Sequence, residues 1–247
     1  MTVKIQEKID ELEKREDFAY IILAYGYCSG GVEGLKTKLA KLVVPKIHDC
    51  IPLLLGETTE EIANKAKNET IANFKNNRDK TYYLSRGWID CGGDVYKQYL
   101  HLTNNMQDWI DRFADFQKKN KQAVVDWQNN DSYHFRRKYS EEDAEFISFE
   151  CLKGYEMVTL IDNDNLAPIH RDYAKEKFDF VDSLLLKYRG RGIEYIEIKG
   201  NLDFLDSLLL PENYSYKKFE GKTGEGVNEL LIFSPGEELK LRKHLLK

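Results

Sequence analysis

The stretch Tyr20-Ile-Ile-Leu-Ala-Tyr-Gly-Tyr-Cys28 is the strongest indication of the fold, because it joins a continuous apolar run to a glycine and a cysteine. An apolar run without polar alternation is typical of a strand buried on both faces of a parallel sheet. Gly26 ends the run and opens a glycine-rich segment that reaches Gly34. We therefore expect a buried parallel strand, followed by a tight turn at the edge where open α/β sheets bind ligands.

Strands and helices are expected to alternate along the rest of the chain. The other apolar runs that predict strands span 42–44, 81–84, 157–161, 193–198 and 230–233. Helical spacing or capping residues predict helices at 3–17, from Pro52, at 58–74, 93–130, 140–154, 168–188 and 202–209. This alternation predicts an α/β protein with a mostly parallel sheet of about six strands and helices on both faces.

The interval between two of the expected strands is unusually long. Residues 85–156 separate them, and large apolar residues recur four and three positions apart from Val95 to Phe116. Because a crossover between parallel strands normally needs one helix, we predict an inserted helical segment there. We expect a single α/β domain over 1–247. Its alternative division into lobes has an N-terminal lobe at 1–92, the helical insert at 93–154 and a C-terminal lobe at 155–247.

The composition is that of an ordinary globular protein. Hydrophobic residues make up 42% of the 247 residues and charged residues 32%, which excludes collagen-like, low-complexity and disordered chains. The net charge of −5 argues against nucleic acid or an anionic membrane as a partner. The charged N-terminus resembles no signal peptide, and no apolar run reaches the roughly 18–20 residues of a membrane span. A cytoplasmic protein is expected.

The four cysteines, Cys28, Cys50, Cys91 and Cys151, are widely spaced and include no C-x-x-C pair, so a disulfide framework is not expected. Cys28 follows the first strand, and His48 and Cys50 follow the second. Two thiolates and an imidazole suit zinc or an iron–sulfur cluster, with Cys91 or solvent completing the set. The alternative is that the cysteines pack as small apolar groups. Cys151, four residues after Ile147, is expected in the core.

Two further groups follow expected strands. The amides of Gly30 and Gly31 could approach a phosphate or a carboxylate, or the glycines could simply permit a tight turn. Arg86 and Trp88 could hold an anionic or planar ligand. They could equally form a salt bridge and a packed indole.

Four motifs resemble the family catalogued as domain of unknown function 1638. They are Tyr25-Gly-Tyr-Cys28, Pro45-Lys-Ile-His48-Asp-Cys50, Ser85-Arg-Gly-Trp88-Ile and Phe233-Ser-Pro-Gly236, and the resemblance runs from about residue 18 to 240. The resemblance implies functional roles for six residues, which are Cys28, His48, Asp49, Cys50, Gly87 and Trp88. Members of this family look like cytoplasmic proteins of anaerobes that are often encoded near corrinoid-dependent methyltransferases. The resemblance therefore implies corrinoid proteins or methyltransferases as partners. The resemblance also implies another strand and helix upstream. This chain departs from that pattern, because its first expected element is the helix at 3–17.

Three functions fit these observations. The first is a metal- or cluster-binding protein accessory to corrinoid-dependent methyl transfer, with Cys28, His48 and Cys50 as ligands. The second is a non-enzymatic binding module for an anionic small molecule or a partner protein. The third is a thiol enzyme with Cys50 as nucleophile and His48 as its base, which is disfavoured because residues two apart on a strand rarely reach hydrogen-bonding distance.

Overall fold

The computed structural model describes residues 2–15, 18–56, 80–91, 94–119, 139–209 and 230–240. The chain divides into two compact units, one formed by Met1–Ile71 with Gly200–Lys247 and the other by Ala72–Lys199. These bounds differ from the lobes expected from the sequence. The segment after residue 199 belongs with the N-terminal part, and the helical insert lies inside the second unit.

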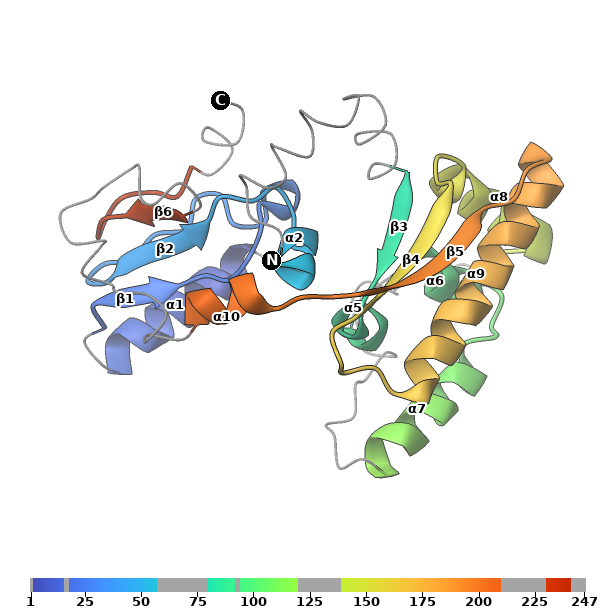
Figure 1. The fold of residues 1–247 in the computed structure, drawn as a ribbon, viewed down its shortest axis with the longest axis horizontal. Helices are drawn as coiled ribbons and strands as arrows, with labels where there is room; N and C mark the ends of the chain where they lie inside the picture. The colour runs from blue at the N-terminus through green and yellow to red at the C-terminus, as the bar shows by residue number, and fades with distance from the viewer. Residues whose placement is uncertain are drawn as a thin grey trace. The chain divides into compact units, whose positions relative to one another are not determined.

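The first unit contains a sheet of three strands, β1 (Tyr20–Ile22), β2 (Lys41–Pro45) and β6 (Leu230–Phe233). Strand β2 lies in the centre, parallel to β1 and antiparallel to β6 (Figure 1). Because β1 and β2 run parallel, their carboxyl ends share one edge of the sheet. That edge leads into the segments that hold Cys28 and Cys50.

Helices of the first unit cover both faces of this sheet, as predicted. Ile9 packs with Leu42 on one face, and Phe204 packs with Val43 on the other. Alternate side chains of β2 point to opposite faces, so both of its faces are buried. The helical elements of this unit are α1 (Thr2–Arg15), the 3₁₀ turn η1 (Cys28–Gly30), α2 (Ile51–Leu55) and α10 (Asp203–Leu209).

The second unit contains a wholly parallel sheet of β3 (Thr81–Leu84), β4 (Met157–Asp162) and β5 (Glu194–Lys199), in that order. The prediction of one sheet of about six strands was therefore wrong, because the described strands form two sheets of three. The physical reason is that β6 pairs antiparallel with β2, with Val43 opposite Ile232. It occupies the sheet position that another parallel strand would have taken.

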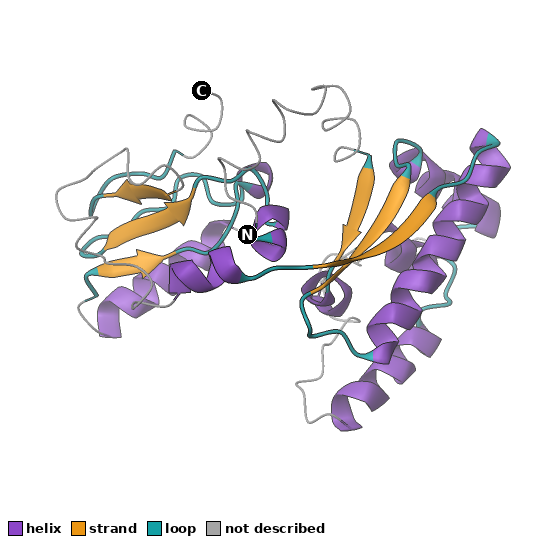
Figure 2. Cartoon of the chain, viewed as in Figure 1, coloured by secondary structure: helices purple, strands orange, loops and turns teal. Residues whose placement is uncertain are grey.

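The helical segment expected between β3 and β4 is present (Figure 2). It is not one continuous helix, since Asn104 has a left-handed backbone (φ 64°) between two of its helices. The expected apolar stripe is buried at Trp109 and Phe113. The helices of this unit are α5 (Arg86–Cys91), α6 (Val95–Leu102), α7 (Gln107–Lys119), α8 (Glu141–Leu152) and α9 (Pro168–Arg189).

These helices pack on one face of the β3–β4–β5 sheet, where Leu84 and Leu160 meet Tyr173 of α9 (Figure 1). Helix α8 begins as predicted, with the Ser140 hydroxyl accepting a hydrogen bond from the Asp143 amide at 3.1 Å. The helix expected at 58–74 lies outside the described residues. No helix in the described ranges has the length and apolar character needed to span a bilayer.

Candidate functional site

Cys28 and Cys50 bring their sulfur atoms within 3.2 Å of each other at the carboxyl edge of the first sheet. Cys28 opens the turn η1 after β1, and Cys50 immediately precedes α2 after β2. The two residues are 22 positions apart in sequence, and the parallel pairing of β1 with β2 brings their segments together. This proximity was expected from the order of the strands.

The two segments approach closely because Gly26 has no side chain. A Cβ atom at this position would lie 2.4 Å from the Asp49 carbonyl carbon, well inside van der Waals contact. Two backbone hydrogen bonds continue the contact, from the Tyr27 amide to the Ile47 carbonyl at 3.1 Å and from the Cys28 amide to the His48 carbonyl at 3.0 Å. Gly26 thus sets the spacing of the turns that carry the sulfurs.

The environments of the two sulfurs differ. The Gly26 amide donates to Cys50 Sγ at 3.3 Å, and the two sulfurs share a hydrogen bond in which either can be the donor. The hydrogen bond from Cys28 lowers the pKa of Cys50 to about 7, aided by the Gly26 amide and opposed by burial. The same hydrogen bond and burial raise the pKa of Cys28. Of the two sulfurs, Cys50 is therefore the one that loses its proton more readily.

Cys28 has a strained backbone. Its φ of 42° lies in the left-handed region, which costs a non-glycine residue roughly 1–2 kcal/mol. Such strain is concentrated at functional sites, where the surrounding structure enforces it. Nearby, the hydroxyl of the partly buried Tyr25 has its pKa raised by burial and by the charges of Cys28 and Cys50.

The structure does not place His48 beside the sulfurs as a third ligand. Its exposed ring packs edge-on against Tyr27, with centroids 5.8 Å apart. The expectation assumed an extended backbone, whereas Cys50 has helical angles (φ −83°, ψ −5°), so side chains two apart do not share a side. Among the described residues, no group of three or more His, Cys, Asp or Glu is arranged to hold a metal ion. The Cys91 side chain lies outside the described part of the chain.

The other predicted residues near Cys28 and Cys50 serve the local backbone. Asp49 Oδ1 accepts from the Ile51 amide at 2.9 Å, at the start of α2. The amides of Gly30 and Gly31 donate to the Tyr27 carbonyl at 2.9 and 3.2 Å. These two amides are used inside the turn, which matches the structural reading of the glycines better than the anion-binding one.

Arg86, Gly87 and Trp88 belong to the second unit, not to the unit that holds Cys28 and Cys50. Arg86 pairs with Asp90 at 3.4 Å and donates to the Asn165 carbonyl at 3.0 Å. Trp88 is 43% exposed, and a Cβ at Gly87 would meet nothing within 4 Å. Arg86 therefore forms the salt bridge that was the alternative to ligand binding.

Cys151 is exposed on α8, and the expectation that it lies in the core was wrong. The expectation rested on its spacing from Ile147, and Ile147 is itself 38% exposed. Both residues lie on the outer side of the helix. Cys151 consequently provides a free thiol with which the Cys28–Cys50 pair can be compared.

A buried histidine in the second unit was not predicted from the sequence. His170 is fully buried, with Nε2 3.0 Å from Asp90 Oδ1. Its Nδ1 accepts a hydrogen bond from the Ala167 amide at 2.8 Å. The ring proton is therefore on Nε2, which donates a hydrogen bond to Asp90. The pair joins α5 to the first turn of α9.

A second buried polar group centres on Asp94. Its carboxylate accepts from the Tyr173 hydroxyl at 2.6 Å and pairs with Lys177 Nζ at 3.2 Å. Lys177 Nζ also lies 3.4 Å from the centre of the Tyr82 ring. Burial lowers the pKa of Lys177 to about 8, although Asp94 partly offsets the effect. One feature of the sequence could have indicated this buried group: Tyr173 and Lys177 are four residues apart and lie on the apolar face of α9.

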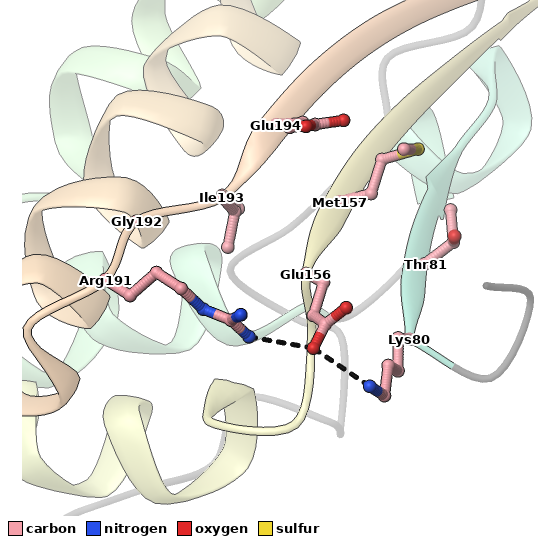
Figure 3. A pocket seen from close by; sticks show the side chains of 8 residues that line it. All are labelled: Lys80, Thr81, Glu156, Met157, Arg191, Gly192, Ile193 and Glu194. Atoms are coloured by element: carbon pink, nitrogen blue, oxygen red, sulfur yellow. Dashed lines mark hydrogen bonds and ion pairs between the residues drawn. The ribbon is translucent and has the colours of Figure 1, made fainter. Parts of the chain in front are cut away.

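A pocket of about 530 Å³ opens at the start of the strands in the second sheet (Figure 3). Lys80 and Arg191 both reach the Glu156 carboxylate, at 2.9 and 2.8 Å. These two cations lower the pKa of Glu156. The pocket is lined by Lys80, Thr81, Glu156, Met157, Arg191, Gly192, Ile193 and Glu194.

A family model described as protein of unknown function (DUF1638) matches residues 1–209. The chain belongs to the DUF1638 family. The match confirms the family resemblance and includes Cys28 and Cys50 as well as the second unit, whereas the motif at Phe233–Gly236 lies beyond the matched residues. Searches of curated proteins and of solved structures find no match to this DUF1638 chain.

Proposed function

We propose that this chain is a metal-binding protein in which Cys28 and Cys50 supply two sulfur ligands. The observation that supports the proposal is the 3.2 Å approach of the two sulfurs. Sulfur–zinc bonds of about 2.3 Å place two thiolates of a tetrahedral zinc site roughly 3.8 Å apart. Small side-chain rotations at the two cysteines provide that spacing. Zinc, or the iron of an iron–sulfur cluster, is the class of metal that thiolates select.

His48 is the proposed third ligand. Among the described residues, its exposed ring makes an edge-on contact with Tyr27, and a rotation about its side-chain bonds would bring an imidazole nitrogen toward the pair. A site with two sulfurs and one nitrogen leaves a fourth position for solvent or a substrate, as in catalytic zinc sites.

The proposed setting is accessory to corrinoid-dependent methyl transfer, with corrinoid proteins or methyltransferases as partners. The support for this setting is the family resemblance. The chemistry is compatible with it, because a metal-bound thiolate pair suits the handling of soft ligands and thiols.

A zinc titration of the full chain, reduced and purified without oxygen, tests the metal site. We expect one equivalent to bind, and Cys28→Ser or Cys50→Ser to weaken binding beyond the roughly 10–100-fold loss that follows removal of a residue that only orients a ligand. Cys151→Ser is the matched control and leaves binding unchanged. His48→Ala tests the third ligand. Equal zinc affinity in wild type, Cys28→Ser and Cys50→Ser would remove the proposal.

The pocket of the second unit supports the other candidate, a binding module for an anionic small molecule or a partner protein. Two cations there share one carboxylate, and the Arg191 side chain is 68% exposed. A phosphate or dicarboxylate would compete with Glu156 for the same donors. Thermal unfolding with and without inorganic phosphate or succinate tests this candidate. A stabilisation that Arg191→Gln abolishes supports it, and no shift with either anion contradicts it.

A further inference from the structure

The Cys28–Cys50 pair is close enough for direct covalent chemistry. A disulfide bond is about 2.05 Å long, so the 3.2 Å separation leaves roughly 1 Å to close. The turns that carry the two residues are joined by backbone hydrogen bonds, which keep the sulfurs together without a metal ion. Disulfides in cytosolic proteins are mostly transient and catalytic or redox-sensing.

The hydrogen bonds give the two sulfurs different roles. The Gly26 amide donates to Cys50 Sγ, and Cys28 Sγ lies 3.2 Å from the same atom. Both residues are partly exposed to solvent. The strained backbone of Cys28 is a second sign that this turn is maintained for function.

We propose that Cys28 and Cys50 form a reversible dithiol–disulfide couple that exchanges with low-molecular-weight disulfides. The proposal uses the same sulfur pair as the metal site and does not require that a metal binds. If both hold, oxidation removes the two sulfur ligands, so the redox state of the pair controls metal binding.

The exchange proceeds in two steps. The Cys50 thiolate attacks one sulfur of a disulfide RSSR, forming a Cys50–SR bond while the S–S bond breaks and RS⁻ leaves to take a proton from solvent. Cys28 then gives its proton to solvent and attacks Cys50 Sγ, forming the Cys28–Cys50 bond and releasing the second RS⁻, which is protonated in turn. Two electrons pass from the cysteine pair to RSSR, which becomes two RSH. Excess RSH reverses both steps.

The test equilibrates the metal-free full chain with mixtures of reduced and oxidised glutathione. Free thiols are then alkylated, and the products are located by peptide mass mapping. We expect wild type and Cys151→Ser to lose two alkylatable thiols together and to yield a peptide pair linked through Cys28 and Cys50. Cys28→Ser should instead accumulate glutathione on Cys50, because the sulfur that releases it is gone.

Two results would overturn the couple. One is wild type that acquires glutathione on single cysteines without forming the Cys28–Cys50 link at any ratio. The other is Cys28→Ser that takes up no more glutathione on Cys50 than on the exposed Cys151. A zinc titration of the same reduced preparation keeps this failure separate from failure of the metal site, because a chain can bind zinc without forming the disulfide, or the reverse.

Discussion

The two units of this protein use polar side chains in opposite ways. In the first unit, Cys28 and Cys50 are half-buried and follow the ends of parallel strands. The Gly26 amide donates to Cys50 Sγ, and the backbone of Cys28 is strained. In the second unit, Asp94 and Lys177 are fully buried, and the Asp94 carboxylate pairs with Lys177 and accepts a hydrogen bond from Tyr173. One group has reactive atoms within reach of solvent, and the other has all its charges inside the core.

The comparison shows that the proximity of reactive side chains is not enough to identify a catalytic or binding site. The Asp94 group contains a carboxylate, a phenol and an amine with a shifted pKa, which resembles catalytic chemistry. Its members have no exposure, so its main effect is on stability. The Cys28–Cys50 pair combines proximity with access. The predictions below test this distinction.

The largest effect is expected from Asp94→Ala. The substitution leaves Lys177 in the core without its counter-charge, and breaking a buried ion pair from one side costs about 3–5 kcal/mol. Urea unfolding of the full chain measures the loss. Glu150→Ala is the matched control, because Glu150 pairs with Lys153 at the surface, and it should change stability by about 1 kcal/mol or less. Equal losses in the two variants would contradict the buried role of Asp94.

The next effect is a pH dependence that belongs to Lys177. Its pKa is about 8 when folded against an ordinary 10.5, so the unfolded chain binds this proton more tightly. The Lys177 contribution therefore makes the chain more stable as pH rises from 8 to 10.5, by the linkage between proton binding and folding. Lys177→Met removes this contribution. We expect the free energy of unfolding of wild type, relative to Lys177→Met, to increase across that window. A pH-independent difference would contradict the assignment.

A smaller effect is expected from Gly26→Ala. The added methyl group would collide with the Asp49 backbone, and overpacking of this kind costs about 1–3 kcal/mol. It should also push the turns apart and weaken zinc binding. Gly87→Ala is the control, because a Cβ there has open space and alanine favours a helix by roughly 0.5–1 kcal/mol over glycine. Denaturant unfolding of both variants checks the opposite signs. Equal stability in the two variants would argue against the close approach at Gly26.

The smallest effect is expected from Arg86→Gln. Arg86 pairs with Asp90 and is partly exposed, so its loss should cost about 1 kcal/mol or less. Zinc binding and thiol exchange at the Cys28–Cys50 pair should not change. An altered zinc affinity in Arg86→Gln would contradict the assignment of Arg86 to a salt bridge.

Most of the helices and strands, and the approach of the two cysteines, could be predicted from the sequence. Apolar runs and capping residues located the strands and helices, and the order of β1 and β2 predicted that Cys28 and Cys50 meet. Strand pairing was not predictable, because nothing in the run Leu230–Phe233 shows that it pairs antiparallel with β2. Cys50 has helical backbone angles where an extended backbone was assumed, so the role of His48 as a third ligand stays a prediction.

The buried network was missed for a different reason. Asp94 and Tyr173 are 79 positions apart, and Asp90 and His170 are 80 apart, so only the packing of α9 against α5 and α6 brings each pair together. Local spacing does not reveal such contacts. Polar residues on the apolar face of α9 were the one available sign, and they indicate partners without identifying them.

Bridging of the two sulfurs by dibromobimane, which becomes fluorescent when both its arms react with thiols, tests the site most directly. We expect fluorescence in the reduced wild type and in Cys151→Ser, with the label joining Cys28 to Cys50 on peptide mapping. Cys28→Ser and Cys50→Ser should lose the signal. Wild-type protein that is labelled on single cysteines only, or that retains full fluorescence after either of these two substitutions, would contradict the paired-thiol site.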